Sequence, residues 1–274
     1  MSTLIERVRK RVSRLRRKAS NPTESPVLVR IKNDPTYPMK ATGLNPDPWQ
    51  AELVNCQSRQ IAVLCTRRAG KSRTVACRTL ARCLTKPKTQ ALIFSPSEGQ
   101  SKELLGYVRE MNDAVGRPVK VIRQSMTELA WENGSVVKAK ADAPKSARGF
   151  TPNILIIDEG AQVSDELYLA VKPMMVLGNA EMMILSTPYG QVGWFFEIWK
   201  DKTILNRWKT FEVNAYQCPR IDKATLEEHR LTMPPRWFDQ EYMLAFNSAV
   251  DAVFPGDIID RAARLDDAYL PLEL

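Results

Sequence analysis

The sequence predicts an α/β protein with a mostly parallel sheet that helices cover on both faces. Apolar runs of four residues recur along the chain and alternate with helical stretches, which is typical of strands buried on both faces. The predicted strands are 61–64, 91–94, 119–122, 154–157 and 182–185. The predicted helices lie near 50–57, 72–85, 99–114 and 165–175. Polar motifs follow three of these strands, at the edge where open α/β sheets bind their ligands.

The first strand leads into seven residues with the layout of a phosphate-binding loop, Thr66-Arg67-Arg68-Ala69-Gly70-Lys71-Ser72. Such a motif consists of a strand, a tight loop that ends in Gly-Lys-Ser/Thr, and a helix. Backbone N–H groups at the helix N-terminus bind phosphate, Lys71 reaches the β- and γ-phosphates, and Ser72 can ligate Mg²⁺. Gly70 lets the backbone approach the phosphates closely. The usual motif begins with glycine, and here Cys65 stands in its place.

Two carboxylates follow the predicted strand 154–157. Asp158 suits the Mg²⁺ shell, and Glu159 suits the base that orients and polarises an attacking water. A core strand that merely ends in two acids is the alternative. The phosphate loop about ninety residues upstream argues against that alternative. The two motifs together predict an ATPase.

Two further segments extend the predicted nucleotide site. Ser186-Thr187-Pro188 follows the strand 182–185, where hydroxyls can sense the γ-phosphate and pass its loss to the next segment. An ordinary turn after a strand is the alternative. Upstream, the ring of Trp49 and the carboxamide of Gln50 can stack on and hydrogen-bond an adenine. For Trp49 the alternative is a place in the core.

Taken together, these residues resemble the large terminase subunit of tailed double-stranded DNA bacteriophages. Pro48-Trp49-Gln50 is similar to the adenine-binding segment of that family, and the loop 66–72 is similar to its deviant phosphate loop, which commonly lacks the first glycine. Further matches to the family are Ser95-Pro96-Ser97 with Gln100, Arg148-Gly149 before the acidic strand, and Ser186-Thr187-Pro188 as the coupling motif.

The resemblance implies a P-loop core of the RecA-like (ASCE) type that hydrolyses ATP with Mg²⁺ and pumps DNA into procapsids. It implies an added arginine at the γ-phosphate, supplied by Arg67 within the loop or by Arg148 from a neighbouring subunit, with Arg68 as the adjacent fallback. The implied partners are double-stranded DNA, the portal protein, the small terminase subunit and four further copies in a pentameric ring. The isolated chain is expected to be a monomer. The implied location is the host cytoplasm and, transiently, the portal vertex of the procapsid, but not the mature virion.

We expect four parts along the chain. These are a basic N-terminal helix with a proline-rich strap (1–36), the P-loop core (37–216), a small lid subdomain (217–250) and a linker (251–274) towards an absent nuclease domain. The strap, 21–38, is expected to be extended. A hairpin with an Asn-Gly turn is predicted between 127 and 141 as a local insertion. The lid is predicted to contain helical segments broken at Pro234-Pro235, and a helix and another strand are expected within 194–216.

Composition narrows the class of protein further. The net charge is +9, and residues 1–20 hold eight basic residues against one acid, Glu6. This amphipathic arm could contact DNA phosphates, dock on a partner, or pack on its own domain. Five cysteines without a C-x-x-C pair predict reduced thiols and no zinc site. No stretch is apolar enough for a membrane span. The acids Asp257, Asp260, Asp266 and Asp267 are interpreted as a solvated helix face, so nuclease activity is not expected.

Two rival functions remain at this stage. A helicase-type ATPase acting on nucleic acid shares the phosphate loop and the acidic strand, but it needs a second RecA-like domain that the residues after the lid are too few to supply. A nucleotide-binding clamp without turnover is the other rival. The presence of Lys71, Asp158 and Glu159 argues against it.

Overall fold

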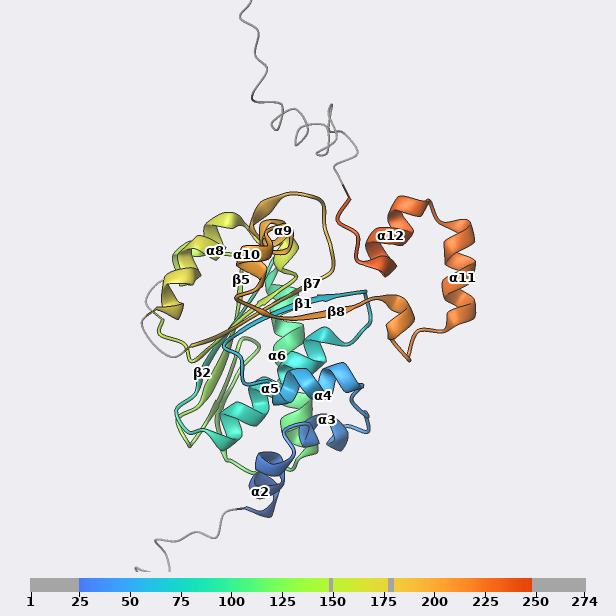
Figure 1. Ribbon diagram of the computed structural model, residues 1–274. Helices are drawn as coiled ribbons and strands as arrows, with labels where there is room; N and C mark the ends of the chain where they lie inside the picture. Colours follow the sequence, from blue (N-terminus) through green and yellow to red (C-terminus); the bar gives the residue numbers. More distant parts are fainter. Residues whose placement is uncertain (1–24, 148–149, 177–179, 248–274) are drawn as a thin grey trace, which may run out of the picture.

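The computed structural model describes residues 25–147, 150–176 and 180–247 of the 274-residue chain. Its centre is an eight-stranded sheet in the order β3-β4-β5-β2-β6-β7-β1-β8 (Figure 1). From β5 to β8 neighbouring strands are parallel, and β4 is antiparallel to both β5 and β3. The strands are β1 (Gln60–Cys65), β2 (Gln90–Ser95), β3 (Val121–Gln124), β4 (Glu128–Trp131), β5 (Val136–Ala141), β6 (Ile154–Asp158), β7 (Glu181–Ser186) and β8 (Lys209–Val213).

Helices lie between the strands in the expected alternation, which confirms the predicted fold class. The α-helices are α2 (Pro26–Asn33), α3 (Tyr37–Ala41), α4 (Pro48–Asn55), α5 (Lys71–Thr85), α6 (Glu98–Ala114), α7 (Pro144–Ala147), α8 (Asp165–Val171), α9 (Gly193–Lys200), α10 (Lys202–Leu205), α11 (Lys223–Thr232) and α12 (Pro235–Met243). Short 3₁₀ helices are η1 (Gly160–Gln162), η2 (Lys172–Met175) and η3 (Ala215–Gln217).

Alternate side chains of the central strands enter two separate cores, one on each face of the sheet. In β2, Ile93 faces the core under α2 to α6, and Phe94 faces the core under α8 and α9. In β6, Ile156 faces the first of these cores and Ile157 faces the second. All four side chains are fully buried, which explains why these strands are continuous apolar runs in the sequence.

The position of β7 decides what meets at the carboxyl edge of the sheet. β7 pairs with β1 on one side and with β6 on the other. Its last residues therefore lie between the loop that follows β1 and the acids that end β6. The three motifs predicted from the sequence share this edge because parallel strands all end there.

Two expectations from the sequence are wrong. The hairpin of β4 and β5 is not a local insertion, because β5 pairs with β2 along its whole length, from Gln90↔Val136 to Ser95↔Ala141. The described part of the strap is not extended, because it contains α2 and α3. Pro26 and Pro38 occupy the first or second positions of these helices, where a missing N–H costs nothing.

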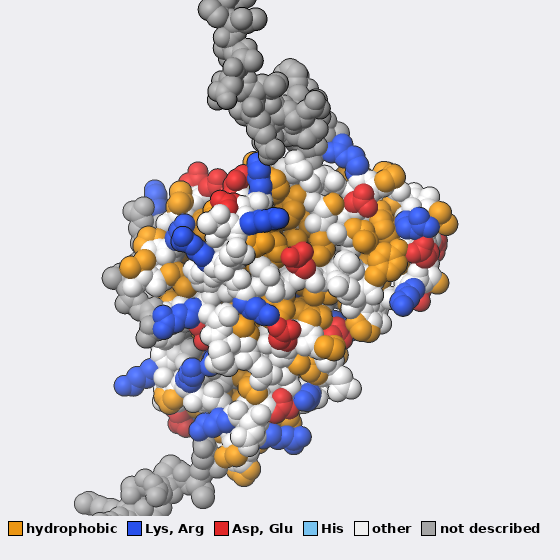
Figure 2. Space-filling view, viewed as in Figure 1, with side chains coloured by type: hydrophobic (Ala, Val, Ile, Leu, Met, Phe, Trp, Pro, Cys, Tyr) orange, Lys and Arg blue, Asp and Glu red, His pale blue; other side chains and the backbone are white. Residues whose placement is uncertain are grey.

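Beyond the sheet, α11 and α12 form a small separate layer (Figure 1). Leu226 of α11 and Phe238 of α12 bury themselves with Ala215 in a third, small core. Other apolar side chains of the pair are exposed, among them Leu231 and Trp237, and apolar atoms gather over these helices in Figure 2. The two predicted helical segments are present and are separated at Pro234-Pro235, as expected.

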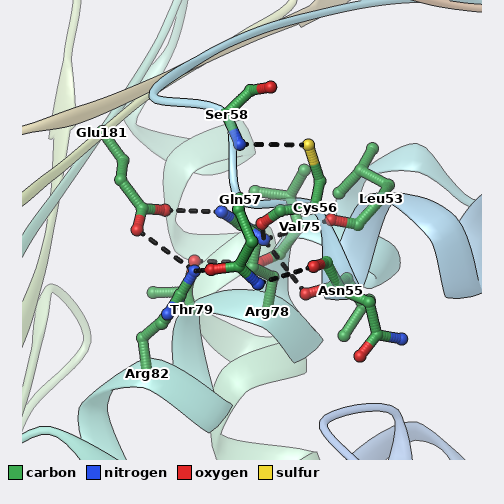
Figure 3. Close-up of polar contacts among 11 residues, drawn as sticks. Leu53, Asn55, Cys56, Gln57, Ser58, Val75, Arg78, Thr79, Arg82 and Glu181 are labelled. Carbon is green, nitrogen blue, oxygen red and sulfur yellow. Dashed lines mark hydrogen bonds and ion pairs between the residues drawn. The ribbon is translucent and has the colours of Figure 1, made fainter. Parts of the chain in front are cut away.

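A buried arginine joins three of the elements that carry the site (Figure 3). Arg78 of α5 is 1% exposed, and its Nη1 donates to the carbonyl oxygens at the end of α4, those of Leu53, Val54 and Cys56, at 3.2, 3.0 and 2.6 Å. Its Nη2 forms an ion pair of 2.7 Å with Glu181 at the start of β7. Since α4, α5 and β7 each carry a predicted site residue, this contact helps to set their relative positions.

Candidate functional site

The loop between β1 and α5 has a backbone that few residues tolerate. Gly70 has φ of 84° and Arg68 has φ of 62°. A Cβ at Gly70 would lie 2.8 Å from Nε2 of Gln50 and 3.2 Å from Nη2 of Arg220. Glycine is therefore required here both by the left-handed conformation and by the close neighbours.

The loop residues and the acids of β6 meet in pairs. Nζ of Lys71 lies 2.7 Å from Oε1 of Glu159. Oγ of Ser72 donates to Oδ2 of Asp158 at 3.2 Å. Lys71 is 8% exposed and Asp158 5% exposed, so both charges are largely removed from water. The structure thus brings together the four residues for which the sequence predicts phosphate, metal and water chemistry.

The electrostatics of this cluster favour an added positive charge. Burial, followed by the neighbouring Glu159 carboxylate, raises the pKa of Asp158 to about 7. For Lys71 burial disfavours the charged form, but Glu159 and Asp158 together raise the pKa of the ammonium above its ordinary value. Two carboxylates share one ammonium, so one negative charge lacks a partner within the cluster. A cation with oxygen ligands would supply that partner.

Glu159 connects the loop to the end of β7. Its Oε2 accepts hydrogen bonds of 3.4 Å from Oγ of Ser186 and from the backbone N–H of Thr187. Glu159 itself has φ of 50°, a left-handed conformation that is costly for a residue with a side chain. Ser186, Thr187 and Pro188 are all buried. The strained backbone and the two weak bonds hold Glu159 between Lys71 and the segment after β7.

The upstream segment reaches the loop through Gln50. Nε2 of Gln50 donates to the carbonyl oxygen of Ala69 at 3.3 Å, and its Oε1 accepts the backbone N–H of Asp47 at 2.8 Å. Arg220, which follows η3, donates to the same Ala69 oxygen at 2.6 Å and pairs with Asp47 at 2.9 Å. Sequence reasoning missed Arg220, because no motif surrounds it and only the return of the chain after β8 places it here.

A cavity of about 680 Å³ adjoins this cluster. Gln50, Arg68, Gly70, Lys71 and Ser72 line it, as do residues that the sequence did not single out, namely Met39, Thr42, Leu44, Arg73, Glu103, Tyr107, Glu110 and Arg220. Trp49 is not among the lining residues. Its side chain packs against the core beneath α4, and its Nε1 is buried without a hydrogen-bond partner among the described residues. The structure therefore brings Gln50, but not Trp49, to the cavity.

The candidate arginines have different positions. Arg67 points towards α12, where its Nε pairs with Oε2 of Glu241. Thr66 donates through Oγ1 to the carbonyl oxygen of Glu241 at 2.8 Å. Arg68 lines the cavity. Arg148 and Gly149 lie outside the described residues, as do the basic arm (1–20) and the four late acids, so the expectations for them stay predictions.

Comparison with known proteins identifies the family. The family model described as "Terminase large subunit, T4likevirus-type, N-terminal" matches residues 63–261. The chain belongs to the large terminase subunit family. This confirms the resemblance, and the helicase-type alternative is not favoured. Among curated terminase large subunits, that of Escherichia phage T5 is 27% identical over 235 residues, which is 82% of this chain and 52% of the relative.

Solved structures of terminases share the fold. The large terminase ATPase domain of Thermus phage P74-26 aligns with a TM-score of 0.66 and 21% identity, over 76% of this chain and 96% of that one. The large terminase of a thermophilic bacteriophage in complex with ADP aligns with a TM-score of 0.58 and 13% identity, over 76% of this chain and 52% of that one. This terminase chain spans about half the length of the curated relatives it matches. No helix among its described residues is both long and apolar enough to cross a bilayer.

Proposed function

We propose that this terminase chain is an ATP-hydrolysing motor that moves viral double-stranded DNA into a procapsid. The observation that carries the proposal is the meeting of Lys71 and Ser72 with Asp158 and Glu159 at one edge of the sheet. A phosphate-binding loop that faces two acids, one suited to a metal ion and one to a water, is the arrangement that phosphoryl transfer to water requires. Family membership supports the same reaction.

The residues fit a magnesium ion. Ser72 Oγ and Asp158 Oδ2 are adjacent oxygen ligands, and the raised pKa of Asp158 reflects a negative charge that a cation would stabilise. Among the described residues no group of three His, Cys, Asp or Glu could hold a metal. Mg²⁺ is usually bound through one or two carboxylates together with phosphates and waters, so a single carboxylate and a hydroxyl are a sufficient contribution from the protein. When bound, the ion would neutralise charge that develops on the β- and γ-phosphates.

Each residue then has a distinct task. Lys71 leaves Glu159 and pairs with the β- and γ-phosphates of the incoming ATP, as the lysine of such loops does. Glu159, released from Lys71, orients the water for in-line attack on the γ-phosphate and polarises it. Backbone N–H groups at the start of α5 hold the phosphates in place. The ion pair of 2.7 Å between Lys71 and Glu159 is thus a contact that the substrate replaces.

The same exchange supports a coupling role for Ser186, Thr187 and Pro188. Ser186 and Thr187 bond the one carboxylate that changes partner when ATP arrives. Their geometry therefore depends on whether Glu159 faces Lys71 or a water. Pro188 fixes the backbone immediately afterwards, so that a small shift at Glu159 moves the segment that leads to α9.

An arginine is still needed to stabilise the transferred phosphoryl group, which in comparable enzymes accelerates turnover about 10³–10⁵-fold. Arg67 acting within its own subunit and Arg148 acting from a neighbour are the two candidates. The ion pair between Arg67 and Glu241 holds the first of them against α12. A neighbour's arginine would make hydrolysis depend on a ring, in this family a pentamer on the portal, with the small terminase subunit as a further partner.

The proposed chemistry is tested by separating binding from hydrolysis. Glu159→Gln is expected to lower phosphate release at least 100-fold while ATP affinity stays within a few-fold, because only the transition state needs the carboxylate. General-base effects are typically about 10²–10⁴-fold. Asp158→Ala is expected instead to weaken binding of ATP in the presence of Mg²⁺. Turnover by Glu159→Gln close to that of the unchanged chain would remove Glu159 from this role.

A further inference from the structure

The cavity beside the phosphate loop has two chemically different ends. Gly70, Lys71 and Ser72 form the end that suits phosphates. Much of the remaining lining comes from α3 and the residues after it, with Met39, Thr42 and Leu44, and from α6, with Glu103, Tyr107 and Glu110; Arg73 of α5 lines the cavity as well. A nucleotide with its phosphates on the loop extends into this second end, because ribose and base lie beyond the α-phosphate. The second end therefore has to accommodate the base.

The residues expected from the sequence to bind the base do not form this end. Trp49 packs against the core and does not line the cavity. The carboxamide of Gln50 already binds Asp47 and Ala69, and its Oε1 also accepts from Arg220 at 3.4 Å. Gln50 can contact one edge of a base, but neither residue offers it a flat surface. An aromatic or planar surface must come from elsewhere.

Two planar groups in the cavity are already stacked on each other. The guanidinium carbon of Arg73 lies 4.4 Å from the centre of the Tyr107 ring. Both ends of the stack are held, because Arg73 pairs with Glu110 at 2.9 Å and the hydroxyl of Tyr107 donates to Glu103 at 2.6 Å. Glu103, Tyr107 and Glu110 recur at helical spacing, so one face of α6 borders the cavity.

The chemistry of this stack is constant over the working pH range. Burial, the hydrogen bond to Glu103 and the charge of that carboxylate raise the pKa of Tyr107 to about 12, so the hydroxyl stays a neutral donor. The Arg73 guanidinium is charged throughout. Leu44 also lines the cavity, is 37% exposed and supplies an apolar side chain. The cavity therefore offers a planar ring both a cation–aromatic stack and an aliphatic side chain.

We propose that the stacked pair of Arg73 and Tyr107 is the wall against which the nucleotide base lies. This rests on the proposed function and names a part of the same site. Stacking on arginine and aromatic planes tolerates any base, since every base has a π-face. The wall therefore contributes affinity without selecting among purines, and any discrimination falls to groups that reach the base edge, such as Gln50.

The test compares a ligand that has a base with one that lacks it, using the 274-residue chain and calorimetric titration in Mg²⁺ buffer. Tyr107→Leu is expected to weaken ATP binding about five- to tenfold, the lower range for loss of one base-stacking side chain. GTP is expected to weaken by the same factor. Binding of inorganic tripolyphosphate should change less than twofold, because the phosphate loop is untouched.

Three further variants make the result decisive. Tyr107→Phe keeps the ring and should bind ATP as the unchanged chain does. Arg73→Lys keeps the charge but loses the planar group, so it should lower the ratio of ATP affinity to tripolyphosphate affinity. Stacking on Trp49 predicts the reverse pattern, with loss of that ratio in Trp49→Leu only. An unchanged ratio in both Tyr107→Leu and Arg73→Lys overturns the proposal. Failure of the unchanged chain to bind ATP would instead overturn the proposed function.

Discussion

At the scale of single residues, the site depends on a carboxylate that the fold makes costly. Asp158 is buried at the end of β6, next to a second carboxylate, and is hydrogen-bonded by Ser72. The left-handed backbone at Glu159 and at Arg68 adds further strain. Costly features of this kind cluster at functional sites, where the surrounding structure holds them in place.

The pH dependence of stability should reveal the free-energy cost of ionising the buried Asp158 carboxyl group. Its pKa in the folded chain, about 7, lies above the ordinary value of 3.8, so the folded state holds this proton more tightly than the unfolded state. Stability from this group is therefore lost as pH rises from about 4 to about 7. Without Mg²⁺ and nucleotide, Asp158→Asn should raise Tm by several degrees at pH 8 and by much less at pH 5. An equal effect at both pH values in thermal scans would contradict the raised pKa.

At the scale of elements, the helices that carry the site are joined away from it, at the C-terminal end of α4 and the middle of α5. Asp47 and Gln50 lie at the start of α4, whose last carbonyl groups accept hydrogen bonds from Arg78. Lys71 and Ser72 begin α5, and Arg78 lies two turns further along the same helix. Through Glu181 the contact extends to β7, whose opposite end carries Ser186. Burial lowers the pKa of Arg78, but a guanidinium stays charged at any ordinary pH.

Removal of this arginine should cost more stability than any surface pair. Arg78→Met removes the guanidinium that donates to three carbonyl groups and pairs with Glu181, which among the described residues keeps only its longer pair of 3.3 Å with Arg82. Breaking a buried ion pair from one side costs about 3–5 kcal/mol. Urea denaturation measures the loss. Arg117→Met, which breaks an exposed i,i+4 pair with Asp113 on α6, is the matched control and should not shift the midpoint measurably. Equal midpoints for the two variants would show that Arg78 does not join these elements.

At the scale of the whole molecule, the layer of α11 and α12 is attached to the loop between β1 and α5. Glu241 of α12 pairs through its side chain with Arg67 and accepts through its carbonyl oxygen from Thr66. Arg220 adds a third contact, to Ala69. The small core of α11 and α12 contains only three fully buried side chains among the described residues. Polar contacts to the loop are therefore a large part of what positions this layer.

Hydrogen exchange should detect the attachment. Glu241→Gln removes the charge that holds Arg67, so amide exchange over 223–243 is expected to accelerate while the central strands stay protected. Asp239→Asn changes an exposed acid of the same helix, for which the structure describes no ion pair, and should leave exchange unaltered. Similar acceleration in both variants would mean that loss of helix charge, and not the contact with the loop, is responsible.

The sequence was sufficient for the fold class, for most elements to within a few residues, and for the loop and acids of the site. These features are local: buried parallel strands are continuous apolar runs, and a Gly-Lys-Ser loop or an acidic strand end consists of neighbouring residues. The paired residues of the site could be anticipated for the same reason, because all parallel strands end at one edge. The predicted Asn-Gly hairpin was right as a local structure.

Pairings between distant segments were decided only by the tertiary structure. The Asn-Gly turn signal predicts the pairing of β4 with β5, but it carries no information on the other edge of β5, which pairs with β2. The prolines of 21–38 predicted an extended strap, whereas burial of Ile31 and Met39 favours helices that prolines can begin. Trp49 and Tyr107 are both aromatic and both pack against the core, and only the placement of α4 and α6 brings the second of them, but not the first, to the lining of the cavity. Arg220 and Glu241 reach the loop from more than 150 residues away, which no spacing of residues encodes.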